Sequence, residues 1–124
     1  MIPWKVLDSV TTAEGELQLR QRGERDFLIT IAGRVLMTST ERTSEKALAS
    51  LALAELPSPK APRVLIGGLG MAYTVRAALD ALPPTASITV AELTPQVLTW
   101  CQGPLAPLTN GAVHDRRVHV VIAD

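Results

Sequence analysis

The chain has 124 residues, of which 47% are hydrophobic, so its composition is that of one globular domain, or of part of one with a small appendage. Twelve basic and twelve acidic residues give zero formal charge, and only 3% of residues are aromatic. These values argue against a nucleic-acid surface, an anionic-membrane surface and a base-stacking platform. The apolar runs are also too short to cross a bilayer. We therefore expect neither a nucleic-acid nor a membrane partner.

The cellular compartment is inferred from the single cysteine and from the N-terminus. Cys101 has no partner for an internal disulfide, which favours a reducing compartment. Residues 1–10 carry charges and lack the apolar stretch of a signal peptide. Together these features predict a cytoplasmic protein. Cys101 itself is interpreted as a small residue on a helix face, and no metal site is expected because no partner lies at ligand spacing.

The N-terminal region, residues 1–43, is predicted to be β-rich. Polar and apolar residues alternate between 16 and 20, as in a half-buried strand. Turn-forming residues at 23–26 and 32–33 separate this segment from further β-prone runs. The predicted strands are residues 4–7, which end near Asp8, and residues 16–20, 27–31 and 34–38. We expect a three- or four-stranded antiparallel meander.

Residues 44–62 are predicted to form a helix and a proline-rich connector. Leu48, Leu51 and Leu56 recur at helical spacing, and Thr43 or Ser44 can cap the first amides. The prolines at 57, 59 and 62 then end the helix and stiffen the connector, where we place the domain boundary.

Residues 63–124 are predicted to alternate between strands and helices. The three expected strands are residues 64–66, 87–93 and 117–122, and the two expected helices are residues 72–82 and the segment from Thr94 to 103. The first strand is apolar throughout, which is typical of a strand with helices on both faces. The whole chain is thus predicted to be α/β, with a small antiparallel meander followed by a partial Rossmann-like βαβαβ unit.

Three glycines, Gly67, Gly68 and Gly70, stand between the first of these strands and its helix. Such a turn presents backbone amides to a ligand. The dinucleotide fingerprint is incomplete because Tyr73 occupies its third glycine position, and this weakens an NAD-binding interpretation. No Lys-Ser or Lys-Thr follows the turn, so a P-loop is excluded.

An acidic residue, Glu92, ends the next predicted strand about 20 residues later, where a carboxylate can accept hydrogen bonds from both hydroxyls of a ribose. With the glycine turn before it, Glu92 predicts a nucleoside site, and Leu93, which follows it, is included in that site. Tyr73 could pack or cover the ligand. Other residues are given structural roles: packing for Trp4 and Trp100, solvated surface for Arg116 and Arg117, and no catalysis for His114 and His119.

The glycine segment 64–70 and the segment 88–95 together resemble the nucleoside site of class I S-adenosylmethionine-dependent transferases. They are most similar to the spermidine synthase-like, or polyamine aminopropyltransferase, branch. That family pairs a small β-domain with a Rossmann-like core and has an Asp-x-Arg-Val motif before its third strand, matched here at residues 115–118. The resemblance covers residues 34–124 and implies that Asp124, after the third strand, contacts the adenine amino group.

The chain also departs from this family. Glu41-Arg42 resembles a family pair, but the Tyr-His-Glu cluster that should follow falls on Ala47-Leu48-Ala49. The family's catalytic aspartate follows a fourth strand, which this chain does not contain. The catalytic residues are therefore unknown, and the resemblance does not support polyamine synthesis by this chain alone.

The predicted function is binding of S-adenosylmethionine or a relative, either its decarboxylated form or methylthioadenosine. The glycine-turn amides would hold the amino-acid or sulfonium portion, Glu92 the ribose and Asp124 the adenine. A methyltransferase remains compatible, because methyl transfer needs little acid–base assistance. The alternatives are a non-catalytic remnant or assembly module and, less favoured, an NAD-binding domain. Because the first strand is left with an open apolar edge, we expect a homo-oligomer or a fragment truncated after the third core strand.

Overall fold

The computed structural model describes residues 2–40 and 61–123. The chain divides into two compact units, Met1–Glu41 and Arg42–Asp124. Some of the predicted features lie outside the described residues: the helix and most of the connector between 44 and 62, the Glu41-Arg42 pair, and Asp124. None of the described helices is long and apolar enough to span a membrane.

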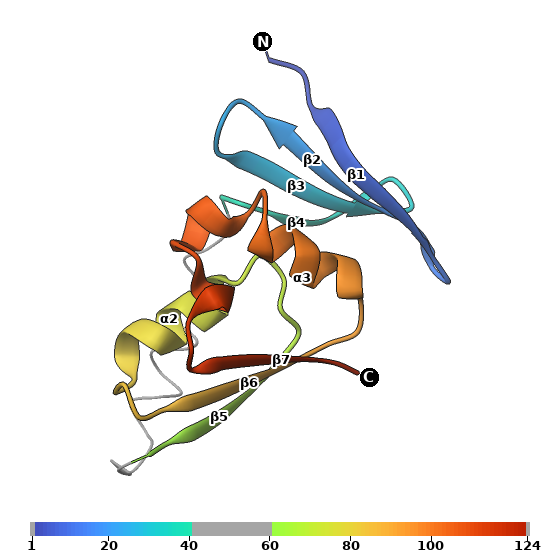
Figure 1. Ribbon diagram of the computed structural model, residues 1–124. Helices are drawn as coiled ribbons and strands as arrows, with labels where there is room; N and C mark the ends of the chain where they lie inside the picture. The colour runs from blue at the N-terminus through green and yellow to red at the C-terminus, as the bar shows by residue number, and fades with distance from the viewer. Residues whose placement is uncertain (1, 41–60, 124) are drawn as a thin grey trace. The chain divides into compact units, whose positions relative to one another are not determined.

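The first unit is a four-stranded antiparallel sheet, which confirms the predicted meander (Figure 1). Its strands follow chain order, and their bounds are β1 Lys5–Thr12, β2 Gly15–Arg22, β3 Asp26–Ile31 and β4 Arg34–Thr38.

Only β1 differs much from prediction, because it continues through Asp8 and Ser9 to Thr12. The register shifts between Val6 and Asp8, so Leu7 is skipped in the ladder, whereas Asp8 and Ser9 pair with Leu19 and Gln18 although both are poor strand formers. Beyond it, Val10 pairs with Leu17 and the strand runs on to a tight turn.

Alternate residues of the two central strands form the core of this unit. Leu17 and Leu19 on β2 are buried, as are Phe27 and Ile29 on β3. Leu19 lies directly opposite Ile29, so the period-two pattern of the sequence places apolar side chains on one face.

The second unit contains a parallel three-stranded sheet in the order β5-β6-β7, in agreement with the predicted βαβαβ topology (Figure 1). The strands are β5 Arg63–Gly67, β6 Ser87–Glu92 and β7 Val118–Ile122, and the helices are α2 Tyr73–Ala81 and α3 Pro95–Gln102. The segment between α3 and β7, predicted to be irregular, contains two short 3-10 helices, η1 Ala106–Thr109 and η2 Ala112–His114.

The helices of this unit cover one face of its sheet (Figure 1). Because the strand order runs in one direction, both right-handed crossovers place their helices on the same side. Ile88 and Val90 point toward these helices and are fully buried. Leu65 points the other way and is 73% exposed, so the prediction that helices cover both faces of β5 is wrong at Leu65.

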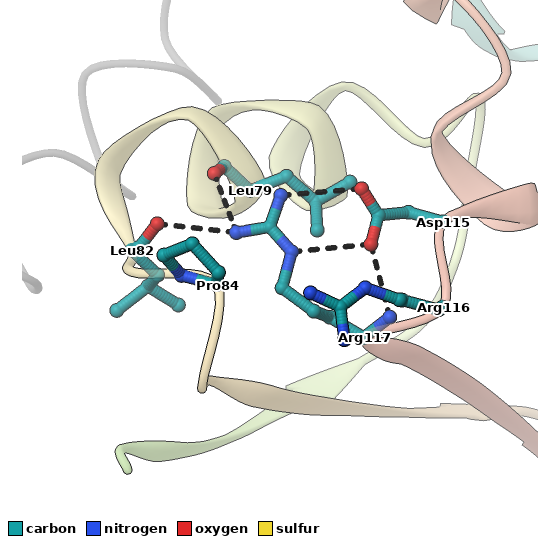
Figure 2. A pocket seen from close by; sticks show the side chains of 6 residues that line it. All are labelled: Leu79, Leu82, Pro84, Asp115, Arg116 and Arg117. Carbon is teal, nitrogen blue, oxygen red and sulfur yellow. Dashed lines mark hydrogen bonds and ion pairs between the residues drawn. The ribbon is translucent and has the colours of Figure 1, made fainter. Parts of the chain in front are cut away.

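Arg117 joins the start of β7 to the end of α2 (Figure 2). Its Nε and Nη2 atoms donate to the two carboxylate oxygens of Asp115 at 3.1 and 3.2 Å. Its Nη1 atom donates to the carbonyl oxygens of Leu79 and Leu82, both at 3.1 Å, and of Pro83 at 3.3 Å. A cation here satisfies carbonyls that the helix end leaves unpaired. The prediction that Arg117 is a solvated surface charge is therefore wrong, because its side chain is only 14% exposed.

The open edge of β5 is present as predicted, since β6 is its one neighbour among the described strands. Association through this edge stays a prediction, and static light scattering tests it. We expect a mass above the 13.3 kDa of one chain. A monomer that binds no apolar dye would contradict the prediction, because the exposed Leu65 face would then cause no association.

The Asp115–Arg117 pair predicts an acid-dependent loss of stability. The side-chain hydrogen bonds from Arg117, followed by the bond from its backbone N–H, hold the pKa of Asp115 below its usual value. A carboxyl whose pKa is lowered by folding stabilises the protein above its unfolded pKa, near 4, and loses this effect as the pH falls through its folded pKa.

We expect Asp115→Asn to lower the free energy of unfolding by about 1 kcal/mol at pH 7. Urea denaturation at several pH values should show this difference shrinking below about pH 4. Asp80→Asn is the control, because Asp80 pairs with Arg76 at 2.8 Å but is 66% exposed and should matter less. A difference between Asp115→Asn and wild type that does not vary with pH would contradict the assigned ion pair.

Candidate functional site

The predicted cofactor-binding residues converge at the carboxyl ends of β5 and β6. Gly67 ends β5 and lies opposite Ala91 in the parallel register, one residue before Glu92. The Gly68 N–H donates to the Ala91 carbonyl at 2.7 Å, so the glycine turn starts beside Glu92. Ligands of open α/β sheets bind outside this edge of the strands.

In the turn after β5, residues with positive φ alternate with residues whose φ is not positive. Gly68, Gly70 and Ala72 have positive φ values of 86°, 55° and 70°, whereas Leu69 and Met71 between them do not. Alternation of this kind gathers successive amide groups around a concavity suited to an anion. Glycine adopts positive φ at little cost, but Ala72 does so with a Cβ atom, which no local sequence pattern predicts.

Glu92 is built into this turn and is only 8% exposed. Its Oε1 accepts the Leu69 N–H at 2.8 Å, and its Oε2 accepts the Thr94 N–H at 2.9 Å. A carboxylate has about four acceptor positions, so each oxygen has one that no described residue fills. The sequence placed Glu92 beside the turn but did not predict that the turn itself binds the carboxylate.

Two amides of the turn have no hydrogen-bond acceptor within the described part of the chain. The Gly68 and Leu69 amides are engaged as above, and the Ala72 N–H donates to the Leu69 carbonyl at 2.9 Å. The amides of Gly70 and Met71 donate no hydrogen bond to any described residue. These two N–H groups are therefore the candidate donors to a ligand, although the Met71 residue is only 3% exposed.

The surface beside the turn is open. A Cβ atom built on Gly67 or on Gly68 would meet no atom within 4 Å. Leu93, directly after Glu92, is 66% exposed and offers an apolar surface. The Ala123 N–H donates to the Glu92 carbonyl at 2.9 Å, so the segment after β7 reaches Glu92, while Asp124 lies outside the described residues.

Cys101 contacts the turn from α3, as a residue on a helix face. Its Sγ atom donates to the Gly70 carbonyl at 3.2 Å, and its side chain is buried. Burial, followed by the nearby charge of Glu92, raises the pKa of the thiol to about 12. The thiol is thus a neutral hydrogen-bond donor, and not a nucleophile.

Two aromatic residues near the turn are packed into the unit. Trp100 is 1% exposed, which confirms its predicted packing role, and Tyr73 is 3% exposed. Of the two interpretations of Tyr73, packing therefore fits better than a cover over the ligand.

A pocket lies at the other end of the sheet, where α2 ends and β7 begins (Figure 2). This pocket of about 550 Å³ is lined by Leu79, Leu82, Pro84, Asp115, Arg116 and Arg117. None of the predicted cofactor-binding residues lines it. Because Arg117 is already bound to Asp115 and to helix carbonyls, the pocket offers few free polar groups, and the glycine turn is the better candidate.

Within residues 2–40 and 61–123, the remaining ionisable groups do not form a catalytic cluster or a metal site. His114 and His119 are exposed, and a ring nitrogen of His114 lies 3.2 Å from the Gln102 carbonyl. No group of three His, Cys, Asp or Glu residues is arranged to hold a metal in this part of the chain.

The sequence matches no family model and no curated protein, but the fold matches solved structures. Spermidine synthase from Thermotoga maritima aligns with a TM-score of 0.78 and 21% identity, over 97% of this chain and 40% of its own. A spermidine synthase in complex with the transition-state analogue AdoDATO aligns with a TM-score of 0.77 and 21% identity, over 97% of this chain and 41% of its own. The chain thus spans about two-fifths of these structures, and it has a spermidine synthase-like α/β fold.

Proposed function

We propose that the second unit binds an adenosyl ligand of the S-adenosylmethionine type at the glycine turn, as the cofactor-binding part of a transferase. The observation that carries this proposal is the hydrogen bond between Glu92 and the turn. It places a buried carboxylate at the same turn as the Gly70 and Met71 amides, which have no acceptor among the described residues. A nucleoside with an acidic tail needs both acceptors and donors at one edge of the sheet.

Each part of the ligand has a matching group. The free acceptor positions of Glu92 suit the two ribose hydroxyls, and the amides of Gly70 and Met71 suit the carboxylate of the amino-acid portion. The open space at Gly67 and Gly68 allows the ligand to approach the backbone closely. Leu93 offers an apolar surface to the adenine ring, and the family resemblance assigns the adenine amino group to Asp124.

The transferase assignment is supported by the likeness in fold. One of the similar structures is a spermidine synthase bound to an adenosyl analogue, and both are spermidine synthases. Because this chain spans about two-fifths of them, aminopropyl transfer and methyl transfer both remain open as reactions. Methyl transfer depends mainly on positioning, so it needs no acid–base residue from the described part of the chain.

Titration calorimetry tests the proposal directly. We expect binding of S-adenosylmethionine, decarboxylated S-adenosylmethionine or methylthioadenosine, and no binding of NAD. Affinity for NAD alone would replace the proposal with the dinucleotide interpretation. No binding of any of these ligands would favour the non-catalytic remnant or assembly module.

Two substitutions test the location of the site without disturbing the fold. Gly67→Ala adds a methyl group to a residue whose φ is not positive and whose surroundings are empty, so stability should hardly change. Leu93→Ala shortens an exposed side chain.

We expect each substitution to weaken adenosyl-ligand binding about fivefold or more, through steric exclusion in one case and lost apolar contact in the other. Leu36→Ala is the matched control, because Leu36 is 54% exposed and lies in the first unit. Wild-type affinity in both Gly67→Ala and Leu93→Ala would place the ligand elsewhere.

Glu92→Ala should affect folding as well as binding, since it leaves the Leu69 and Thr94 amides without their acceptor. Each buried unsatisfied amide costs about 1–3 kcal/mol, so we expect the free energy of unfolding to fall by about 2–5 kcal/mol. Glu14→Ala, at an exposed acid, should leave it nearly unchanged. Equal denaturation midpoints for the two variants would contradict the structural part of the Glu92 assignment.

A further inference from the structure

The peptide group between Gly70 and Met71 connects the Cys101 thiol to a free amide. Its carbonyl accepts the hydrogen bond from Cys101 Sγ at 3.2 Å. Its N–H belongs to Met71 and donates to no described residue. In a planar trans peptide the carbonyl and the N–H point in opposite directions. Holding the carbonyl toward α3 therefore aims the Met71 N–H away from α3.

The orientation of this peptide group is not fixed by the backbone alone, because Gly70 is flexible. Gly70 has a φ of 55°, and a glycine can exchange this conformation for others at little cost. The Gly68–Leu69 peptide, two peptide groups earlier, is fixed in another way, since the Leu69 N–H donates to Glu92. Glu92 and Cys101 thus restrain two peptide groups of the same turn, Gly68–Leu69 through its N–H and Gly70–Met71 through its carbonyl.

The hydrogen bond requires a protonated thiol. Cys101 is 2% exposed, and burial together with the Glu92 charge raises its pKa to about 12. A thiolate would face the Gly70 carbonyl without a proton to donate. At neutral pH the thiol therefore stays a donor.

We propose that Cys101 is a positioning residue that, by binding the Gly70 carbonyl, directs the Met71 N–H toward the carboxylate of the ligand. This inference rests on the proposed function and adds to it a preference between two kinds of adenosyl ligand. The Cys101 contact should favour adenosyl ligands that carry a carboxylate, such as S-adenosylmethionine, over methylthioadenosine, which has none.

The test compares three substitutions of Cys101 by calorimetry with both ligands. Cys101→Ser keeps a hydrogen-bond donor. Cys101→Val and Cys101→Ala both remove the donor, but valine adds side-chain volume whereas alanine reduces it. We expect Cys101→Val and Cys101→Ala to weaken S-adenosylmethionine binding about fivefold, the equivalent of one net hydrogen bond. Methylthioadenosine binding should stay within about twofold, and Cys101→Ser should resemble wild type for both ligands.

A purely structural role of Cys101 predicts a different result. Val97 is buried on the same helix, so Val97→Ala should lower the denaturation midpoint without changing the ratio of the two affinities. If Cys101→Ala and Cys101→Val leave that ratio unchanged while the ligands still bind, the inference fails and the proposed function stands. If wild type binds only decarboxylated S-adenosylmethionine, the inference fails and the proposed function stands. If wild type binds none of the three adenosyl ligands, both fail.

Discussion

The second unit depends on one interaction, the pair of hydrogen bonds that Glu92 accepts from the Leu69 and Thr94 amides. This carboxylate connects the end of β6 to the turn before α2 and to the residue that precedes α3. A buried charge is costly unless its acceptor positions are filled, and the backbone fills one on each oxygen. The same residue therefore stabilises the fold and leaves acceptors at the surface where a ligand is expected.

A similar solution appears at the opposite end of the sheet, with the charge reversed. There the guanidinium of Arg117 binds the carbonyls that end α2, as the Glu92 carboxylate binds amides at the starts of the loop and of α3. Each charged group is satisfied mainly by backbone atoms of neighbouring segments. The difference lies in what remains free: the Glu92 end has amides without an acceptor in the described part of the chain, and open space, whereas Arg117 is surrounded by acceptors. This contrast distinguishes a candidate binding site from a structural clamp.

Sequence patterns predicted the elements of the second unit to within about a residue at most ends, because glycines and prolines mark where its helices and strands stop. They also predicted that Gly68 and Glu92 lie together. They could not predict contacts that depend on three-dimensional packing: the Cys101 bond to Gly70, the exposure of Leu65, or the role of Arg117. The positive φ of Ala72 could not be predicted either, since alanine has no local preference for it. The length of β1 was missed because an irregularity interrupts its alternation.

In both sheets, the order of the strands in space is their order along the chain. Every paired strand has its partner immediately before or after it, so no strand has to be inserted between two that are already joined. The hairpin loops of the first unit are short and cost little entropy to close, whereas each parallel pair of the second unit needs a crossover that contains a helix. During synthesis β5 can pair with β6 as soon as β6 emerges, and β7 then adds at the free side of β6. Among the described strands, β5 thus lies at the boundary of its sheet at each step of this order.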